Sequence, residues 1–141
     1  MYQARMRTLA FAVFAIAAGC GGGSDAPFVW TWLVTNTDGT NACPPVPSDI
    51  TGTQDEFTLS ASDGELVRDT CNLRLSVSGN RASLVAPADC AYGPLQIFHY
   101  KQFDVQTTDG KTISGAVMGQ YDSNPPGCSI TAHFSGGRTT H

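Results

Sequence analysis

The chain of 141 residues is long enough for one globular domain with a substantial core. It carries 8 Lys and Arg residues against 12 Asp and Glu residues, a formal net charge of −4 at pH 7. Because affinity for a phosphate backbone depends on cationic neutralisation, this acidic balance argues against a nucleic-acid partner. The basic residues are also scattered singly, so the sequence shows no basic patch for a membrane surface.

The first 19 residues predict a signal peptide for export. Arg5 and Arg7 precede an apolar run from Leu9 to Ala18, and small residues stand before Cys20. This run is shorter than the roughly 20 apolar residues that a membrane-spanning helix needs. We therefore expect residues 1–19 to be removed by cleavage.

The segment Ala17-Ala18-Gly19-Cys20 resembles the lipobox of bacterial lipoproteins. In that family the cysteine thiol is diacylated, and the cysteine becomes the first residue of the mature chain. The resemblance therefore implies a lipid on Cys20 that anchors the protein to a membrane. Gly21 follows, where lipoproteins retained at the inner membrane of Gram-negative bacteria have aspartate. The resemblance thus implies the outer membrane. The small and polar residues of 20–27 predict a flexible tether between lipid and domain.

Four cysteines follow the lipobox, and an even number in an exported chain indicates two disulfides. The chain has no Cys-x-x-Cys motif, and the wide cysteine spacings do not resemble a zinc knuckle, so we expect no metal site. Cys71 and Cys90 flank a predicted hairpin at Ser78-Gly79-Asn80 and would join its open end. Cys43 and Cys128 would then join the loop after the first strand to the start of the last.

From Phe28 onward apolar and polar residues alternate with a period of two, which predicts strands. The first strand would present an aromatic face that includes Trp30 and Trp32. Dipeptides such as Asp63-Gly64 and Asp109-Gly110 predict tight hairpins. We expect seven or eight strands and almost no helix in the mature domain. The predicted strands cover Phe28–Thr35, Gln54–Ser62, Glu65–Ser78, Arg81–Ala86, Leu95–Thr107, Thr112–Tyr121 and Cys128–Ser135.

Strands joined by tight turns leave two exposed edges, and closing the sheet removes them. An all-β, up-and-down antiparallel barrel over residues 28–141 is therefore our first expectation, with a β-sandwich as the alternative. The Trp-rich first strand, Lys111-Thr112-Ile113-Ser114-Gly115 and Phe134-Ser135-Gly136-Gly137-Arg138 resemble uncharacterised small bacterial lipoproteins. This resemblance covers about residues 28–138 and implies a lipocalin-like or avidin-like barrel. It implies no reaction and no site residues.

The predicted strand from Leu95 to Thr107 has apolar residues at both odd and even positions. If the odd positions face inward, His99 and Lys101 lie side by side in the barrel lumen, where they could meet an anionic ligand. If a β-bulge near His99 exchanges the two faces, Phe98 and Tyr100 turn inward and Lys101 faces solvent. The sequence leaves both possibilities open.

Further candidates for ligand contact are Trp30, Trp32 and Tyr121. The two tryptophans are interpreted first as core residues and second as a stacking surface. Gly115 and Gly119 share the face of Tyr121, where they could leave room for a ligand or let a large neighbour pack closely.

No motif predicts catalysis, because the chain has no Gly-x-Ser-x-Gly elbow and no Asp-x-Asp-x-Asp calcium loop. We expect a non-enzymatic, membrane-anchored envelope lipoprotein without a cofactor, whose barrel binds a small apolar or amphipathic ligand. The alternative is a structural or protein-interaction module of an envelope complex, with a packed interior and no ligand. A lumen of roughly 300 Å³ or more, lined by aromatic side chains, would favour ligand binding.

Overall fold

The computed structural model describes residues 24–43, 48–93, 96–122 and 127–139. The predicted signal peptide, Cys20 and residues 21–23 of the predicted tether lie outside the described residues. At the end of the tether, the backbone N–H of Phe28 donates to the carbonyl of Asp25 (2.9 Å), so the chain enters the domain through a turn. Within the described ranges, no helix has the length and apolar character needed to cross a membrane.

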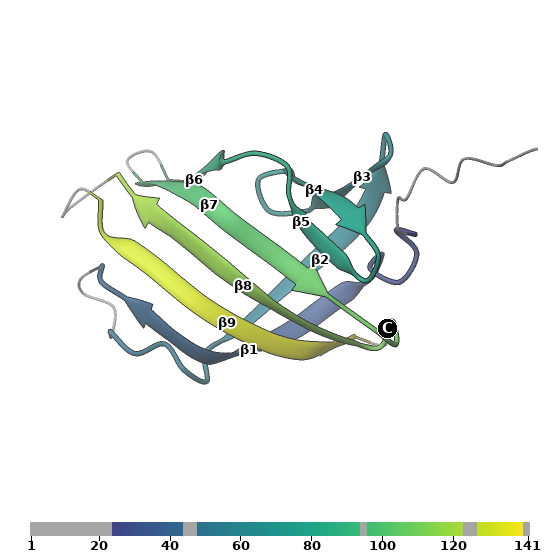
Figure 1. The fold of residues 1–141 in the computed structure, drawn as a ribbon. Helices are drawn as coiled ribbons and strands as arrows, with labels where there is room; N and C mark the ends of the chain where they lie inside the picture. The colour runs from purple at the N-terminus through teal and green to yellow at the C-terminus, as the bar shows by residue number, and fades with distance from the viewer. Residues whose placement is uncertain (1–23, 44–47, 94–95, 123–126, 140–141) are drawn as a thin grey trace, which may run out of the picture.

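All regular structure in the described part of the chain is β-strand, as the period of two predicts (Figure 1). The strands between residues 65 and 84 are short, and turns of a few residues join them. The strands are β1 (Thr31–Asn41), β2 (Gln54–Ser62), β3 (Glu65–Arg68), β4 (Leu73–Ser78), β5 (Arg81–Leu84), β6 (Ala88–Gly93), β7 (Gln96–Gln106), β8 (Thr112–Tyr121) and β9 (Ser129–Arg138).

The strands form a closed antiparallel barrel of eight strands, with β6 outside it. Strands β1 to β5 are neighbours in chain order, while β9, β8 and β7 continue the sheet from the other edge of β1. β5 then pairs with β7, with Ala82 opposite Val105, and this pairing closes the barrel. β6 pairs with the first half of β7. The predicted up-and-down barrel is confirmed, and a β-sandwich is excluded because the strands form one closed sheet.

Alternate strand residues point into the barrel and form one core. In β1, Trp32 and Val34 are buried, whereas Leu33 between them is 42% exposed. In β2, Phe57 and Leu59 are buried in the same way. Burying one such side chain contributes roughly 1.5–3 kcal/mol, so this alternation is the main source of the barrel's stability.

The two ends of the barrel differ (Figure 1). At one end, here named the closed end, the β4–β5 turn and the β7–β8 loop lie beside the segment that enters β1. Phe28 is fully buried there, and the indole Nε1–H of Trp32 donates to the Phe28 carbonyl (2.9 Å). The opposite end, named the open end, carries the β3–β4 turn, β6 and both disulfides.

Both predicted disulfide pairings are confirmed. Cys43–Cys128 joins the segment after β1 to the residue that precedes β9. Cys71–Cys90 joins the β3–β4 turn to β6, so the strand outside the barrel is covalently tied to the barrel itself. A disulfide typically contributes about 2–4 kcal/mol, mainly by restricting the unfolded chain.

A β-bulge in β7 decides which of its residues face inward. The register between β7 and β8 shifts immediately after Tyr100, so Phe98 and Tyr100 are buried on one side of the bulge and Phe103 on the other. Lys101 is exposed, and the His99 side chain is 36% exposed on the outer face. The inward placement of His99 and Lys101 is therefore wrong, and the bulge alternative is confirmed. The extra residue allows the core to take apolar side chains on both sides of Lys101.

The first strand begins later than the sequence pattern predicts. Because β1 starts at Thr31, the preceding turn removes Trp30 from the alternation, and Trp30 is 42% exposed. The guanidinium carbon of Arg138 lies 4.3 Å from the centroid of the Trp30 ring, a cation–π contact on the outer surface. The prediction of a core position is wrong for Trp30 and right for Trp32.

Candidate functional site

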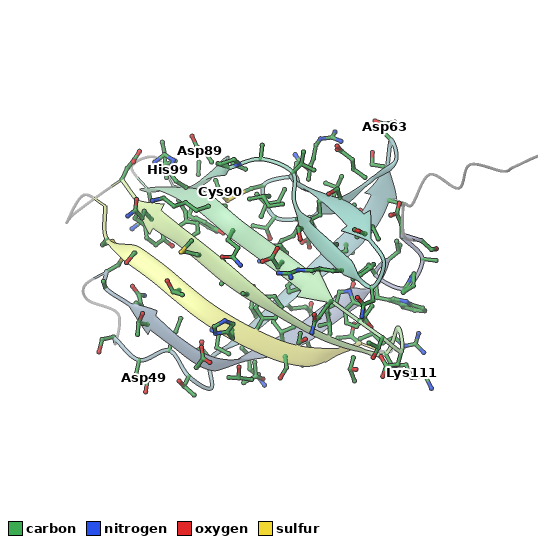
Figure 2. The ribbon with its side chains drawn as sticks, in the orientation of Figure 1. Asp49, Asp63, Asp89, Cys90, His99 and Lys111 are labelled. Carbon is green, nitrogen blue, oxygen red and sulfur yellow. A yellow bond between two sulfur atoms is a disulfide. The ribbon has the colours of Figure 1, made fainter. Side chains whose placement is uncertain are left out.

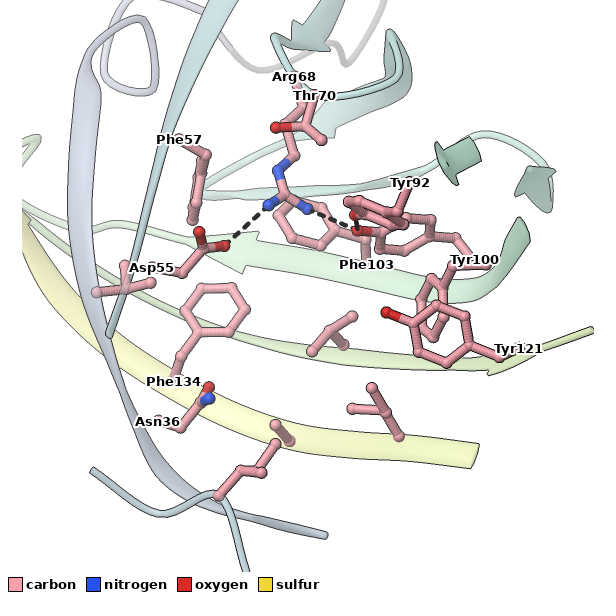
Figure 3. A pocket seen from close by; sticks show the side chains of 16 residues that line it. Asn36, Asp55, Phe57, Arg68, Thr70, Tyr92, Tyr100, Phe103, Tyr121 and Phe134 are labelled. Carbon is pink, nitrogen blue, oxygen red and sulfur yellow. Dashed lines mark hydrogen bonds and ion pairs between the residues drawn. The ribbon is translucent and has the colours of Figure 1, made fainter. Parts of the chain in front are cut away.

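A pocket of about 320 Å³ lies in the open-end part of the lumen (Figure 3). Its apolar wall includes Phe57, Phe103 and Phe134, whose rings contact one another with centroids 5.6–6.0 Å apart. The side chain of Asp55 is 58% exposed and Tyr92 is 46% exposed, so these two residues stand where the pocket meets solvent. The volume falls at the lower end of the range for small-molecule sites, roughly 300–1,000 Å³.

Arg68 supplies the cationic side chain of the pocket. It is the last residue of β3, and its inward direction follows from the alternation in that strand, where Leu66 is also buried. The residue is only 5% exposed. One terminal nitrogen, Nη2, donates to the Asp55 carboxylate (2.9 Å), and the other, Nη1, donates to the Tyr100 hydroxyl (3.2 Å). Nε is buried without a hydrogen-bond partner among the described residues.

Three aromatic rings surround the Arg68 guanidinium group, and those of Phe103 and Phe57 are nearer than that of Tyr100. The guanidinium carbon lies 4.8 Å from the centroid of the Phe103 ring and 5.0 Å from that of Phe57. Such cation–π contacts are stronger when the charge is desolvated, reaching about 2 kcal/mol. These contacts restrict the orientation of the guanidinium plane. Its N–H groups therefore point in defined directions in the pocket (Figure 3).

Three tyrosines add hydroxyl groups to the pocket. The hydroxyls of Tyr92 and Tyr100 are 2.6 Å apart and share a hydrogen bond. Figure 3 shows the Tyr121 hydroxyl directed into the pocket, and it forms no hydrogen bond within the described part of the chain. Burial raises the pKa of Tyr92, an effect to which the bond with Tyr100 adds, and burial likewise raises the pKa of Tyr121. Tyrosine ordinarily ionises only near pH 10, so both hydroxyls carry their proton at neutral pH.

The structure separates the five predicted ligand-contact residues. Tyr121 lines the pocket. Trp32 is fully buried in the core beneath it, whereas Trp30 lies on the outer surface at the closed end. Lys101 and His99 lie on the outer face of β7 and do not line the pocket.

Gly115 and Gly119 serve close packing. A Cβ atom on Gly115 would collide with the ring of Phe134, and one on Gly119 would collide with the ring of Phe98. The missing side chains therefore let two large rings lie against β8, and the space they leave is already filled.

Outside the barrel, His99 contacts two carboxylates, one of them that of Asp89, which is labelled beside it in Figure 2. Its Nδ1 lies 2.5 Å from Asp89 on β6, and its Nε2 hydrogen-bonds Asp122, which follows β8. These bonds, led by the one to Asp89, raise the pKa of His99. Within the described ranges, no group of three or more His, Cys, Asp or Glu side chains is arranged to hold a metal ion.

Arg68 is the residue of the candidate site that the sequence pattern does not single out. Leu66 and Arg68 share the same parity in a short strand and therefore the same face. The basic residues are scattered singly and form no patch, and arginine is usually exposed, so this parity alone does not predict a buried charge. No local pattern predicts that Arg68 meets Asp55 and Tyr100, because the three residues come from different strands.

The chain matches no protein-family model, and no curated protein or solved structure shows significant similarity to it. The chemistry of the pocket is therefore the ground for a functional proposal.

Proposed function

We propose that this protein is a non-enzymatic lipoprotein of the cell envelope whose barrel binds a small amphipathic ligand. The lumen pocket is the observation that carries the proposal. Protein interiors normally pack as densely as organic crystals, with few voids larger than a water molecule. A pocket of about 320 Å³ that combines aromatic walls with a few polar groups has the character of a ligand site.

The cellular setting of the proposal rests on other features. Two disulfides indicate an oxidising compartment, in agreement with an exported chain. The lipobox-like segment ending at Cys20 supports a lipid anchor, and Gly21 supports the outer membrane of a Gram-negative bacterium. The alternative, a structural or protein-interaction module with a packed interior, is disfavoured by the pocket.

The test is binding of N-phenyl-naphthylamine, a neutral apolar dye whose fluorescence rises in apolar surroundings. We expect a saturable rise with the wild-type protein. Val117→Phe should weaken binding by about tenfold or more, because Val117 lines the pocket and the larger ring would occupy it.

The matched control is Met118→Phe on the next residue of β8, which is 37% exposed and does not line the pocket. This variant should bind the dye like the wild type. If the wild type shows no saturable binding, or if both variants bind alike, the proposal of a lumen site is wrong.

A further inference from the structure

Arg68 has more hydrogen-bonding capacity than its neighbours use. A guanidinium group carries five N–H donors. The structure gives it two hydrogen bonds, one to Asp55 and one to the neutral hydroxyl of Tyr100, and leaves Nε unpaired among the described residues. A charged group that is buried with incomplete hydrogen bonding is costly. Such a group is expected where a further partner binds.

Among the described residues that line the pocket, one carries a negative charge, and it pairs with only one nitrogen of Arg68. Asp55 is the acidic residue among those that line the pocket, and its side chain is 58% exposed against 6% for Arg68. The Asp55 carboxylate is therefore far more accessible to solvent than the Arg68 guanidinium. The cation lies deeper than its counterion, so a second anion entering from solvent can gain an interaction that Asp55 supplies only in part.

The rings around Arg68 determine what else the anion must carry. The rings of Phe57 and Phe103 lie against the guanidinium carbon, so a further polar partner has to bond the N–H groups. Two of the guanidinium nitrogens already donate to Asp55 and Tyr100. The rest of the wall is largely apolar, and Phe134 is one example. The Tyr121 hydroxyl, which has no hydrogen-bond partner among the described residues, offers one more donor in the same pocket. A ligand that fits both parts has one anionic group and an apolar body.

We propose that the ligand is a small amphiphile with one carboxylate, whose head binds the Arg68 guanidinium and whose apolar body lies against the aromatic wall. This inference rests on the proposed function and assigns its ligand class. A single negative charge fits better than two, because Asp55 repels additional negative charge at the pocket mouth.

The experiment compares octanoate, octanol and octylammonium, which share one alkyl chain and differ in the head group. Binding to the full mature protein is measured by calorimetry at neutral pH. We expect octanoate to bind at least about tenfold more tightly than octanol, the ratio that a charge-assisted hydrogen bond supplies. Equal affinity for the three compounds, or preference for octylammonium, would overturn the inference.

Two variants separate the roles of the charges. Arg68→Gln should bring octanoate affinity down to that of octanol. Asp55→Asn should strengthen octanoate binding several-fold and leave octanol unchanged, because it removes a competing carboxylate from Arg68. If Arg68→Gln does not fold, Asp55→Asn still decides, since unchanged or weaker octanoate binding in that variant contradicts the inference.

The dye separates this inference from the proposed function. A wild-type protein that binds N-phenyl-naphthylamine but does not prefer octanoate has a lumen site for another class of ligand. A protein that binds neither the dye nor any of the three octyl compounds lacks the proposed function itself.

Discussion

On the outer face of the barrel, a single imidazole is held between two carboxylates. Asp89 and Asp122 each bond one ring nitrogen of His99, and both bonds need an N–H donor when the carboxylates are ionised. The arrangement therefore favours the imidazolium form. It joins β6, β7 and the end of β8, so the charge of His99 helps to hold the outside strand to the barrel.

The raised pKa of His99 predicts a pH dependence of stability. The stabilisation should be fully present below about pH 6.5, the pKa of unperturbed histidine, and should disappear as pH rises through the higher pKa of the folded state. We expect the unfolding temperature of the wild type to fall between pH 6 and pH 9 by more than that of His99→Gln. Because the group is exposed, the difference should be small.

Thermal unfolding followed by circular dichroism measures this difference. An NMR titration gives the pKa of His99 directly. Parallel pH profiles for wild type and His99→Gln, together with an NMR pKa at or below 6.5, would contradict the prediction.

The turn that precedes β1 closes one end of the barrel. Phe28 is completely buried although it belongs to no strand, and its carbonyl accepts the indole N–H of Trp32. A non-repetitive segment thus supplies one of the largest buried side chains of the core. The closed end is sealed by this ring, whereas the open end retains the pocket.

We predict that Phe28→Ala lowers the free energy of unfolding by about 3–5 kcal/mol, the usual cost of truncating a buried aromatic ring. Phe28→Leu should cost less, because it leaves a smaller cavity. The control is Val29→Ala on the neighbouring residue, which is 37% exposed and should change stability by under about 0.5 kcal/mol. Urea unfolding provides the measurement, and similar losses for Phe28→Ala and Val29→Ala would show that the ring does not seal the end.

Local patterns account for the part of the fold that could be predicted from sequence. The alternation around Leu73 and Leu75 and the tight turn at Asp109-Gly110 are encoded within a few residues, so most strands, the hairpins and barrel closure could be predicted. The prediction of one strand over Glu65–Ser78 is wrong, because the chain turns between β3 and β4, and β6 was not predicted as a strand. The bulge at Lys101 could not be located in this way. Its position is set by the pairing of β7 with β8 and by the core on either side, both of which are long-range.

The candidate site was predictable only in part for the same reason. Tyr121 could be chosen because its strand alternates regularly, whereas Trp30 was misplaced because the strand begins one residue after it. The contact of Arg68 with Asp55 and Tyr100 depends on how far neighbouring strands are staggered around the barrel. That stagger is a property of the closed sheet and leaves no local signal in the sequence.

Over the whole molecule, the entry of the chain and the pocket mouth lie at opposite ends. The segment from Asp25 to Phe28 enters at the closed end, while Asp55 and Tyr92 border the pocket toward the open end. If Cys20 carries lipid, the tether would place the closed end nearest to the membrane and leave the mouth directed away from it. Ligand binding and anchoring would then be independent of each other.

This independence gives the last prediction. The wild-type protein produced in bacteria should partition into the detergent phase of a Triton phase separation, because two acyl chains anchor a protein stably. Cys20→Ser should move to the aqueous phase and still bind N-phenyl-naphthylamine with wild-type affinity, since the pocket lies at the other end of the barrel. Equal partitioning of the two proteins would show that Cys20 carries no lipid. Loss of dye binding in a correctly folded Cys20→Ser protein would show that anchoring and binding are coupled.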